Sequence, residues 1–111
     1  MVIVYAITCA ATDMAYIGST AGKLNKRMRE HRRLLNGGIH TCIALQSDWA
    51  KLGPSHFQSH VLEVVHVKNL DVETKRETEL RWMGFYRDNG MLYNAEADEK
   101  RRQAGELQMM R

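Results

Sequence analysis

The sequence lacks what builds a disulfide scaffold, a membrane protein or a long disordered chain. Its 111 residues include two cysteines, one proline and eight glycines. Cys9 and Cys42 are too few and too far apart for a disulfide framework or a CxxC zinc site. No apolar run approaches the roughly 20 residues of a membrane span, and the N-terminus has no basic segment typical of a signal peptide. These absences predict a reduced, cytoplasmic protein with no membrane association.

What the sequence does contain predicts one small domain with a concentrated positive charge. The hydrophobic content of 44% and charged content of 26% are ordinary for a globular domain. Residues 21–35 hold six basic side chains and one acidic one, a local net charge of +5 in a chain of net +3. Such a cluster favours a surface that binds nucleic-acid phosphates, although charge alone fits a solvated helix face equally well. Besides Arg27, the basic residues are Lys23, Lys26, Arg29, Arg32 and Arg33.

The first twenty residues predict a β-hairpin. Residues 2–8 and 14–20 are rich in β-branched and aromatic side chains, and the short connection between them favours an antiparallel pair. If the loop comprises residues 9–12, Tyr5 lies directly opposite Tyr16 on the same face of the sheet. This pairing depends on the loop length, because a slip of one residue would separate the two side chains.

The remaining residues predict helices grouped around a third strand. The apolar spacing indicates a helix over 23–35, a second from a Thr41 cap to Leu52, and a third from Asp71 to about Asp88. Residues 57–67 predict a strand with a buried centre. The order ββααβα indicates an α+β fold with a small three-stranded antiparallel sheet flanked by helices. We expect the domain to comprise residues 1–95, with 96–111 as a tail or short helix.

Glu79 stands out in the third predicted helix. Helical spacing places it among Trp82, Met83 and Tyr86, inside the apolar stripe. An ionised carboxylate is seldom buried without a partner, because desolvation costs several kcal/mol. Periodicity alone therefore predicts either a salt bridge to a nearby arginine or a bound metal ion.

Several of these positions, taken in order, resemble the motifs of the GIY-YIG nucleases. The second signature triplet is intact at residues 16–18, while residues 3–5 keep the tyrosine of the first triplet and lack its glycine. Arg27 and His31 match the family's arginine and the histidine four residues later. His40 precedes a Leu-Gln pair, and Glu79 begins a Glu-x-x-aromatic-aliphatic motif. The Tyr-Asn pair ending at Asn94 resembles the one that closes the family's catalytic module.

The resemblance implies a metal-dependent endonuclease that hydrolyses DNA phosphodiester bonds. Glu79 would bind Mg²⁺ or Mn²⁺, and Arg27 would pair with the scissile phosphate. Tyr5 is the first candidate for the general base, and Tyr16 would orient water or phosphate. The roles of His31 stay open between base and proton shuttle.

The resemblance also implies supporting roles for two further side chains. His40 would contact the phosphate or the edge of the site, and Asn94 would organise the site through hydrogen bonds. The basic residues of the first helix would contact the DNA backbone.

Two other interpretations remain open at this point. The chain could be a non-catalytic nucleic-acid binding module of the same fold, or a protein–protein scaffold with an incidental motif. Cleavage specificity, a homing, restriction, phage or repair role, and the choice between monomer and homodimer cannot be deduced from these residues.

Overall fold

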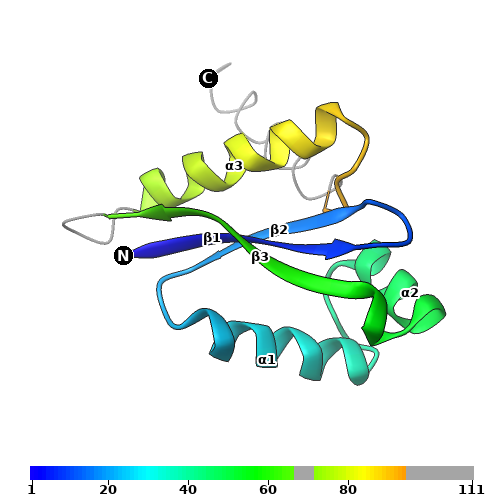
Figure 1. Cartoon of the computed structure of the whole chain (residues 1–111). Helices are drawn as coiled ribbons and strands as arrows, with labels where there is room; N and C mark the ends of the chain where they lie inside the picture. Colours follow the sequence, from blue (N-terminus) through cyan, green and yellow to red (C-terminus); the bar gives the residue numbers. More distant parts are fainter. Residues whose placement is uncertain (67–71, 95–111) are drawn as a thin grey trace, which may run out of the picture.

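The structure, a computed structural model, describes residues 1–66 and 72–94 and has an α+β architecture (Figure 1). Its antiparallel sheet has the strand order β2-β1-β3, so β1 is central. The sheet has α3 (Val72–Asp88) on one face and α1 (Leu24–Asn36) with α2 (Ile43–Leu52) on the other (Figure 1). In chain order the elements are β1 (Val2–Cys9), β2 (Ala15–Thr20), α1 (Leu24–Asn36), α2 (Ile43–Leu52), the 3-10 helix η1 (Pro54–His56), β3 (Phe57–Val65) and α3 (Val72–Asp88).

The alternation of side chains along β1 divides the apolar residues between two cores. Tyr5 and Ile7 pack with Met28 and Trp49 on the side of α1 and α2. Val4 and Ala6 point the other way and pack, among others, with Met83 of α3. Both faces of the central strand are therefore buried, which holds the first tyrosine of the sequence motif rigidly between sheet and helix.

The hairpin register differs from the prediction. The loop comprises residues 10–13, with the Cys9 amide donating to the Met14 carbonyl at 2.9 Å. Asp13 adopts the left-handed conformation (φ 59°), which aspartate tolerates better than most residues. Tyr5 consequently pairs with Gly18, and Tyr16 pairs with Ile7. A shift of two residues preserves the faces, so both tyrosines still point towards α1.

Two further local predictions were wrong. The centre of β3 is not buried, since Val61 is 52% exposed and Val64 is 42% exposed. The strand is the outer neighbour of β1, and its apolar sequence was mistaken for that of a central strand. Cys42, not Thr41, is the N-cap of α2.

Several predicted boundaries lie outside the described residues. These are the end of the third strand at Val67, the cap at Asp71 and the tail at 96–111. Within the described part of the chain, no helix combines the length and apolar character of a membrane span.

Candidate active site

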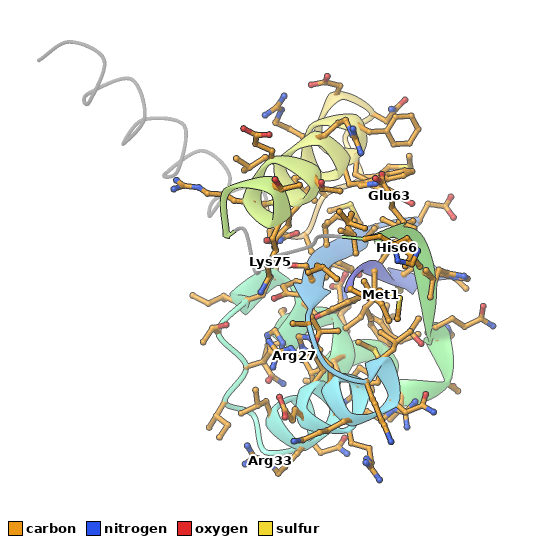
Figure 2. The ribbon with its side chains drawn as sticks, turned by 90° about the vertical axis from the view of Figure 1, so that its left-hand side faces the viewer. Met1, Arg27, Arg33, Glu63, His66 and Lys75 are labelled. Carbon is orange, nitrogen blue, oxygen red and sulfur yellow. The ribbon has the colours of Figure 1, made fainter. Side chains whose placement is uncertain are left out.

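A cavity of about 460 Å³ lies beside the outer strand β2, between α1 and the beginning of α3. Four of the five predicted catalytic side chains line it, and His31 is the exception. Figure 2 shows Arg27 and Lys75, from the two helices, on the same face of the molecule. The lining residues are Tyr5, Tyr16, Gly18, Ser19, Arg27, Lys75, Arg76 and Glu79.

Gly18 allows the Tyr5 ring to lie across the neighbouring strand. A Cβ atom at position 18 would stand 2.5 Å from the Tyr5 hydroxyl oxygen and 2.6 Å from Cζ. No side chain fits there while the ring stays in place. The glycine of the second triplet therefore leaves the space that the tyrosine ring of the first triplet occupies. This close packing fixes the phenol at the cavity wall.

We expect Gly18→Ala to displace the Tyr5 ring. Overpacking of this kind costs about 1–3 kcal/mol, and the displaced hydroxyl would also lose its place in the cavity. Gly22→Ala is the matched control, because its nearest contact would be an ordinary 3.7 Å to Thr20 Oγ1. Urea unfolding and a chemical-shift map of both variants measure the effect. Unchanged Tyr5 ring signals in Gly18→Ala would contradict this account of the glycine.

Behind the cavity, three side chains form a buried hydrogen-bond chain. The Tyr5 hydroxyl lies 2.6 Å from His31 Nε2, and His31 Nδ1 lies 2.8 Å from His40 Nε2. The Cys42 backbone N–H donates to His40 Nδ1 at 3.0 Å. The Tyr16 ring packs edge-on against both imidazoles, at 5.2 Å from His31 and 5.5 Å from His40 between ring centroids. His31, 2% exposed, thus lies behind the phenols and not at the cavity surface.

The loop between α1 and α2 places His40 in this chain. The Gln46 side chain accepts from the His40 backbone N–H at 3.0 Å and donates to the Leu35 carbonyl at 2.9 Å. One amide thus ties the end of α1 to the segment before α2. Sequence reasoning assigned no role to Gln46, although it belongs to the Leu-Gln pair of the motif.

The surroundings shift the pKa values of the buried groups in specific directions. Burial, followed by the positive charge of Arg27, lowers the pKa of His31 to about 4, so the imidazole is neutral at physiological pH. Burial raises the pKa of Tyr5 above its ordinary value, with a further contribution from Tyr16. The Arg27 guanidinium opposes this rise through its charge and a hydrogen bond. In the free protein Tyr5 is therefore a neutral phenol.

The lowered pKa of His31 predicts a loss of stability in mild acid. Between its unfolded value of about 6.5 and its folded value of about 4, only the unfolded chain binds the proton. The free energy of unfolding is thus highest above pH 6.5 and falls as the pH drops towards 4. Urea unfolding at pH 7.5 and 5.5 measures this, with His31→Gln as the comparison. An equal loss in both proteins would show that His31 is not the group responsible.

Arg27 and Glu79 approach the cavity from opposite helices. Arg27 Nη1 contacts the Glu30 carboxylate of its own helix at 2.8 Å, which leaves other guanidinium donors for a ligand. Glu79 is partly buried, and its Oε2 accepts a 2.7 Å hydrogen bond from Ser19 Oγ. Arg81, an arginine of the same helix close to Glu79 in sequence, pairs with Glu63.

The residues around Glu79 fit a hydrated divalent cation. Within the described part of the chain, no three His, Cys, Asp or Glu side chains gather as a metal cluster. Mg²⁺ requires only one or two carboxylates and keeps several waters. A single carboxylate beside a serine hydroxyl, at the wall of a 460 Å³ cavity, provides this donor set and the space for water.

Comparison with known proteins identifies the family. The family model of the GIY-YIG catalytic domain matches residues 1–100. The chain belongs to the GIY-YIG family. No curated protein matches it significantly.

Two solved structures share the GIY-YIG fold with this chain. One is the catalytic domain of the homing endonuclease I-TevI, with a TM-score of 0.73 and 24% identity, covering 84% of this chain and 96% of that one. The other is a mutant of the catalytic domain of the intron endonuclease I-TevI, with a TM-score of 0.72 and 24% identity, covering 84% of this chain and 92% of that one. At 24% identity, these two matches show a shared fold.

Asn94 closes the GIY-YIG module by completing the outer edge of β2. Leu92 forms a parallel bridge with Ala15. The Asn94 side chain then accepts from the Ile17 amide at 3.1 Å and donates to the Ile17 carbonyl at 2.9 Å. The side-chain amide thus continues the strand pairing for one more residue. Tyr16 and Gly18, the two neighbours of Ile17 along β2, both line the cavity.

The basic residues that line the cavity differ from most of those predicted from the sequence. Except for Arg27, the basic residues of 21–35 are exposed and do not line the cavity, whereas Lys75 and Arg76 of α3 do. Sequence reasoning missed these two as ligand-binding residues. The available signal was their spacing, four and three residues before Glu79, which places them one helical turn away on the same face.

Proposed function

We propose that the chain is a metal-dependent endonuclease that hydrolyses DNA phosphodiester bonds in the cavity beside β2. The observation that carries this proposal is that Arg27, Glu79 and two tyrosines, Tyr5 and Tyr16, line one cavity. A phosphodiester cleavage site needs a group that binds the phosphate, a proton acceptor for water and a cation ligand. The membership of the GIY-YIG family supports the same activity.

Glu79 would hold the divalent cation, with Ser19 fixing one carboxylate oxygen by its hydrogen bond. When bound, Mg²⁺ or Mn²⁺ supplies Lewis-acid stabilisation of the phosphate charge. Arg27 would bind the same phosphate through its planar pair of N–H donors. The Glu30 carboxylate, 2.8 Å from Arg27 Nη1, holds one end of the guanidinium.

Tyr5 and Tyr16 would act on the attacking water from the sheet side of the cavity. Tyr5 is the proposed base, and it must ionise at a cost that its burial increases. The Arg27 guanidinium would stabilise the phenolate that results through its charge and its hydrogen bond. Tyr16 lies two residues from Gly18 on the same face of β2 and lines the cavity, so its hydroxyl would orient water or phosphate.

The substrate backbone would extend from α1 across to the beginning of α3. Lys75 and Arg76 line the cavity from the helix opposite Arg27. Lys23 lies one turn before Arg27 and would contact a flanking phosphate, with Lys26, Arg29, Arg32 and Arg33 further along the exposed surface. DNA would thus be contacted from both sides of the cavity.

Replacing Lys75 and Arg76 together by alanine is expected to weaken DNA binding and to reduce its salt dependence. Each lost phosphate contact lowers the slope of log affinity against log salt by about 0.9. The matched control is Lys51→Ala with Arg81→Ala, which removes the same charge from exposed positions that do not line the cavity. Fluorescence anisotropy with a short duplex, at several salt concentrations, compares the two. Equal losses in both double variants would contradict a path across α3.

Incubation of the pure protein with supercoiled plasmid, with and without Mg²⁺ or Mn²⁺, tests the activity itself. We expect metal-dependent nicking or linearisation by the wild type and little by Arg27→Ala, with Lys51→Ala, at an exposed position of α2, as the charge-matched control. DNA binding without cutting under every metal, salt and pH condition would favour the non-catalytic binding module.

A further inference from the structure

The hydrogen-bond chain behind Tyr5 can carry its protons in only one arrangement. The Cys42 backbone amide always donates, so His40 Nδ1 must be the unprotonated acceptor. Neutral His40 then carries its proton on Nε2 and donates to His31 Nδ1. His31 in turn carries its own proton on Nε2, which therefore donates to the Tyr5 oxygen. The polarity of all three bonds follows from one backbone N–H.

The alternative arrangements fail at His40. If Tyr5 donated its proton to His31 Nε2, His31 would have to donate from Nδ1 to His40 Nε2. His40 would then accept at both ring nitrogens and be an anionic imidazolate, which is not populated at neutral pH. A doubly protonated His31 meets the same obstacle. His31 therefore cannot take a proton from Tyr5 while the chain is intact.

We propose that His40 is a positioning residue that locks His31 as a hydrogen-bond donor to Tyr5 and leaves the Tyr5 proton facing the cavity. This inference rests on the proposed function for its catalytic consequence. It excludes His31 as the acceptor in a proton shuttle, and it replaces the expected contact between His40 and phosphate. Tyr5 then exchanges its proton with the cavity side, and its oxygen keeps a donor when it ionises.

The groups that face His31 allow this arrangement to persist over a wide pH range. Tyr5 and Tyr16 face it from the sheet, and His40 faces it from the loop before α2. Arg27 and Glu30, on its own helix, contribute opposite charges. Protonation of either imidazole would have to break a hydrogen bond at 2.8–3.0 Å inside the fold.

Nuclear magnetic resonance of the full chain with ¹⁵N-labelled histidine tests the proton positions directly. We expect both His31 and His40 to be neutral with the proton on Nε2 between pH 6 and 8. A proton on His31 Nδ1, or a His31 cation at pH 7, would overturn the proposal. This measurement needs no cutting, so an inactive wild type would count against the proposed function and leave the proton arrangement to be decided by the spectra.

Two variants test the consequence for activity. His40→Leu is expected to lower kcat for plasmid cutting by roughly tenfold to a hundredfold, with little change in KM, as for other residues that orient a catalytic group. His40→Gln should recover most of the rate, because its amide N–H can replace Nε2–H as the donor to His31. His66→Leu, at an exposed histidine, is the control. Equal kcat in His40→Leu and wild type, or a loss in His40→Gln as large as in His40→Leu, would contradict the positioning role.

Discussion

Glu79→Gln is expected to reduce metal-dependent cutting by about a thousandfold or more. The change keeps the size of the side chain and a hydrogen-bond acceptor for Ser19, and it removes the negative charge that would hold the cation. Loss of Lewis-acid stabilisation is worth several kcal/mol, and each 1.36 kcal/mol is a factor of ten in rate. Single-turnover cutting over a range of Mg²⁺ and Mn²⁺ concentrations measures the effect.

The control for this substitution is Glu77→Gln on the exposed side of the same helix. It removes the same charge two residues away and should cut at the wild-type rate. If Glu79→Gln keeps the full rate at low metal concentration, the cation is held elsewhere and the assignment of Glu79 is wrong.

Tyr5→Phe is the second substitution with a large expected effect, a fall in kcat of about 10²–10⁴-fold. It removes the oxygen that receives the His31 hydrogen bond at 2.6 Å and that faces the cavity. The ring itself stays against Gly18, so DNA binding should change little. The variant also leaves the His31 N–H without its partner, which costs about 1–3 kcal/mol of stability.

Single-turnover rates and DNA affinity separate these two effects for Tyr5→Phe. Tyr86→Phe, a tyrosine of α3 packed against the other core, provides the control for removal of a phenol oxygen. A loss of DNA affinity with an unchanged cutting rate at saturating DNA would show that Tyr5 binds substrate and takes no part in the chemical step.

Much of the fold could be predicted from local patterns. The apolar spacing over residues 23–35 predicts a helix with one buried face, and α1 buries Met28, His31 and Leu35. The hairpin register could not be obtained in this way, since it depends on where the loop begins. Asp13 in the left-handed conformation moves the loop by one residue and the pairing by two. The exposure of β3 could not be predicted either, because the position of a strand in the sheet is set by the topology and not by the residues of that strand.

The residues of the site could be predicted from the sequence, but the hydrogen bonds between them could not. The resemblance named Tyr5, Arg27 and Glu79, which line one cavity. It could not reveal the hydrogen-bond chain from Tyr5 through His31 to His40. The position of His40 depends on the path of the loop and on the two hydrogen bonds of the Gln46 side chain. The contribution of α3 beyond Glu79 was also missed: helical spacing places Lys75 and Arg76 one turn from Glu79, but only the folded sheet brings them to the same cavity as Arg27.

The most direct measurement is a structure of the Glu79→Gln variant bound to a short DNA duplex. We predict one backbone phosphate in the cavity beside β2, hydrogen-bonded to Arg27 and within reach of the Tyr5 hydroxyl, with the strand continuing towards Lys75. A duplex bound only along the outer surface of α1, with no phosphate near Arg27 and Tyr5, would contradict the account.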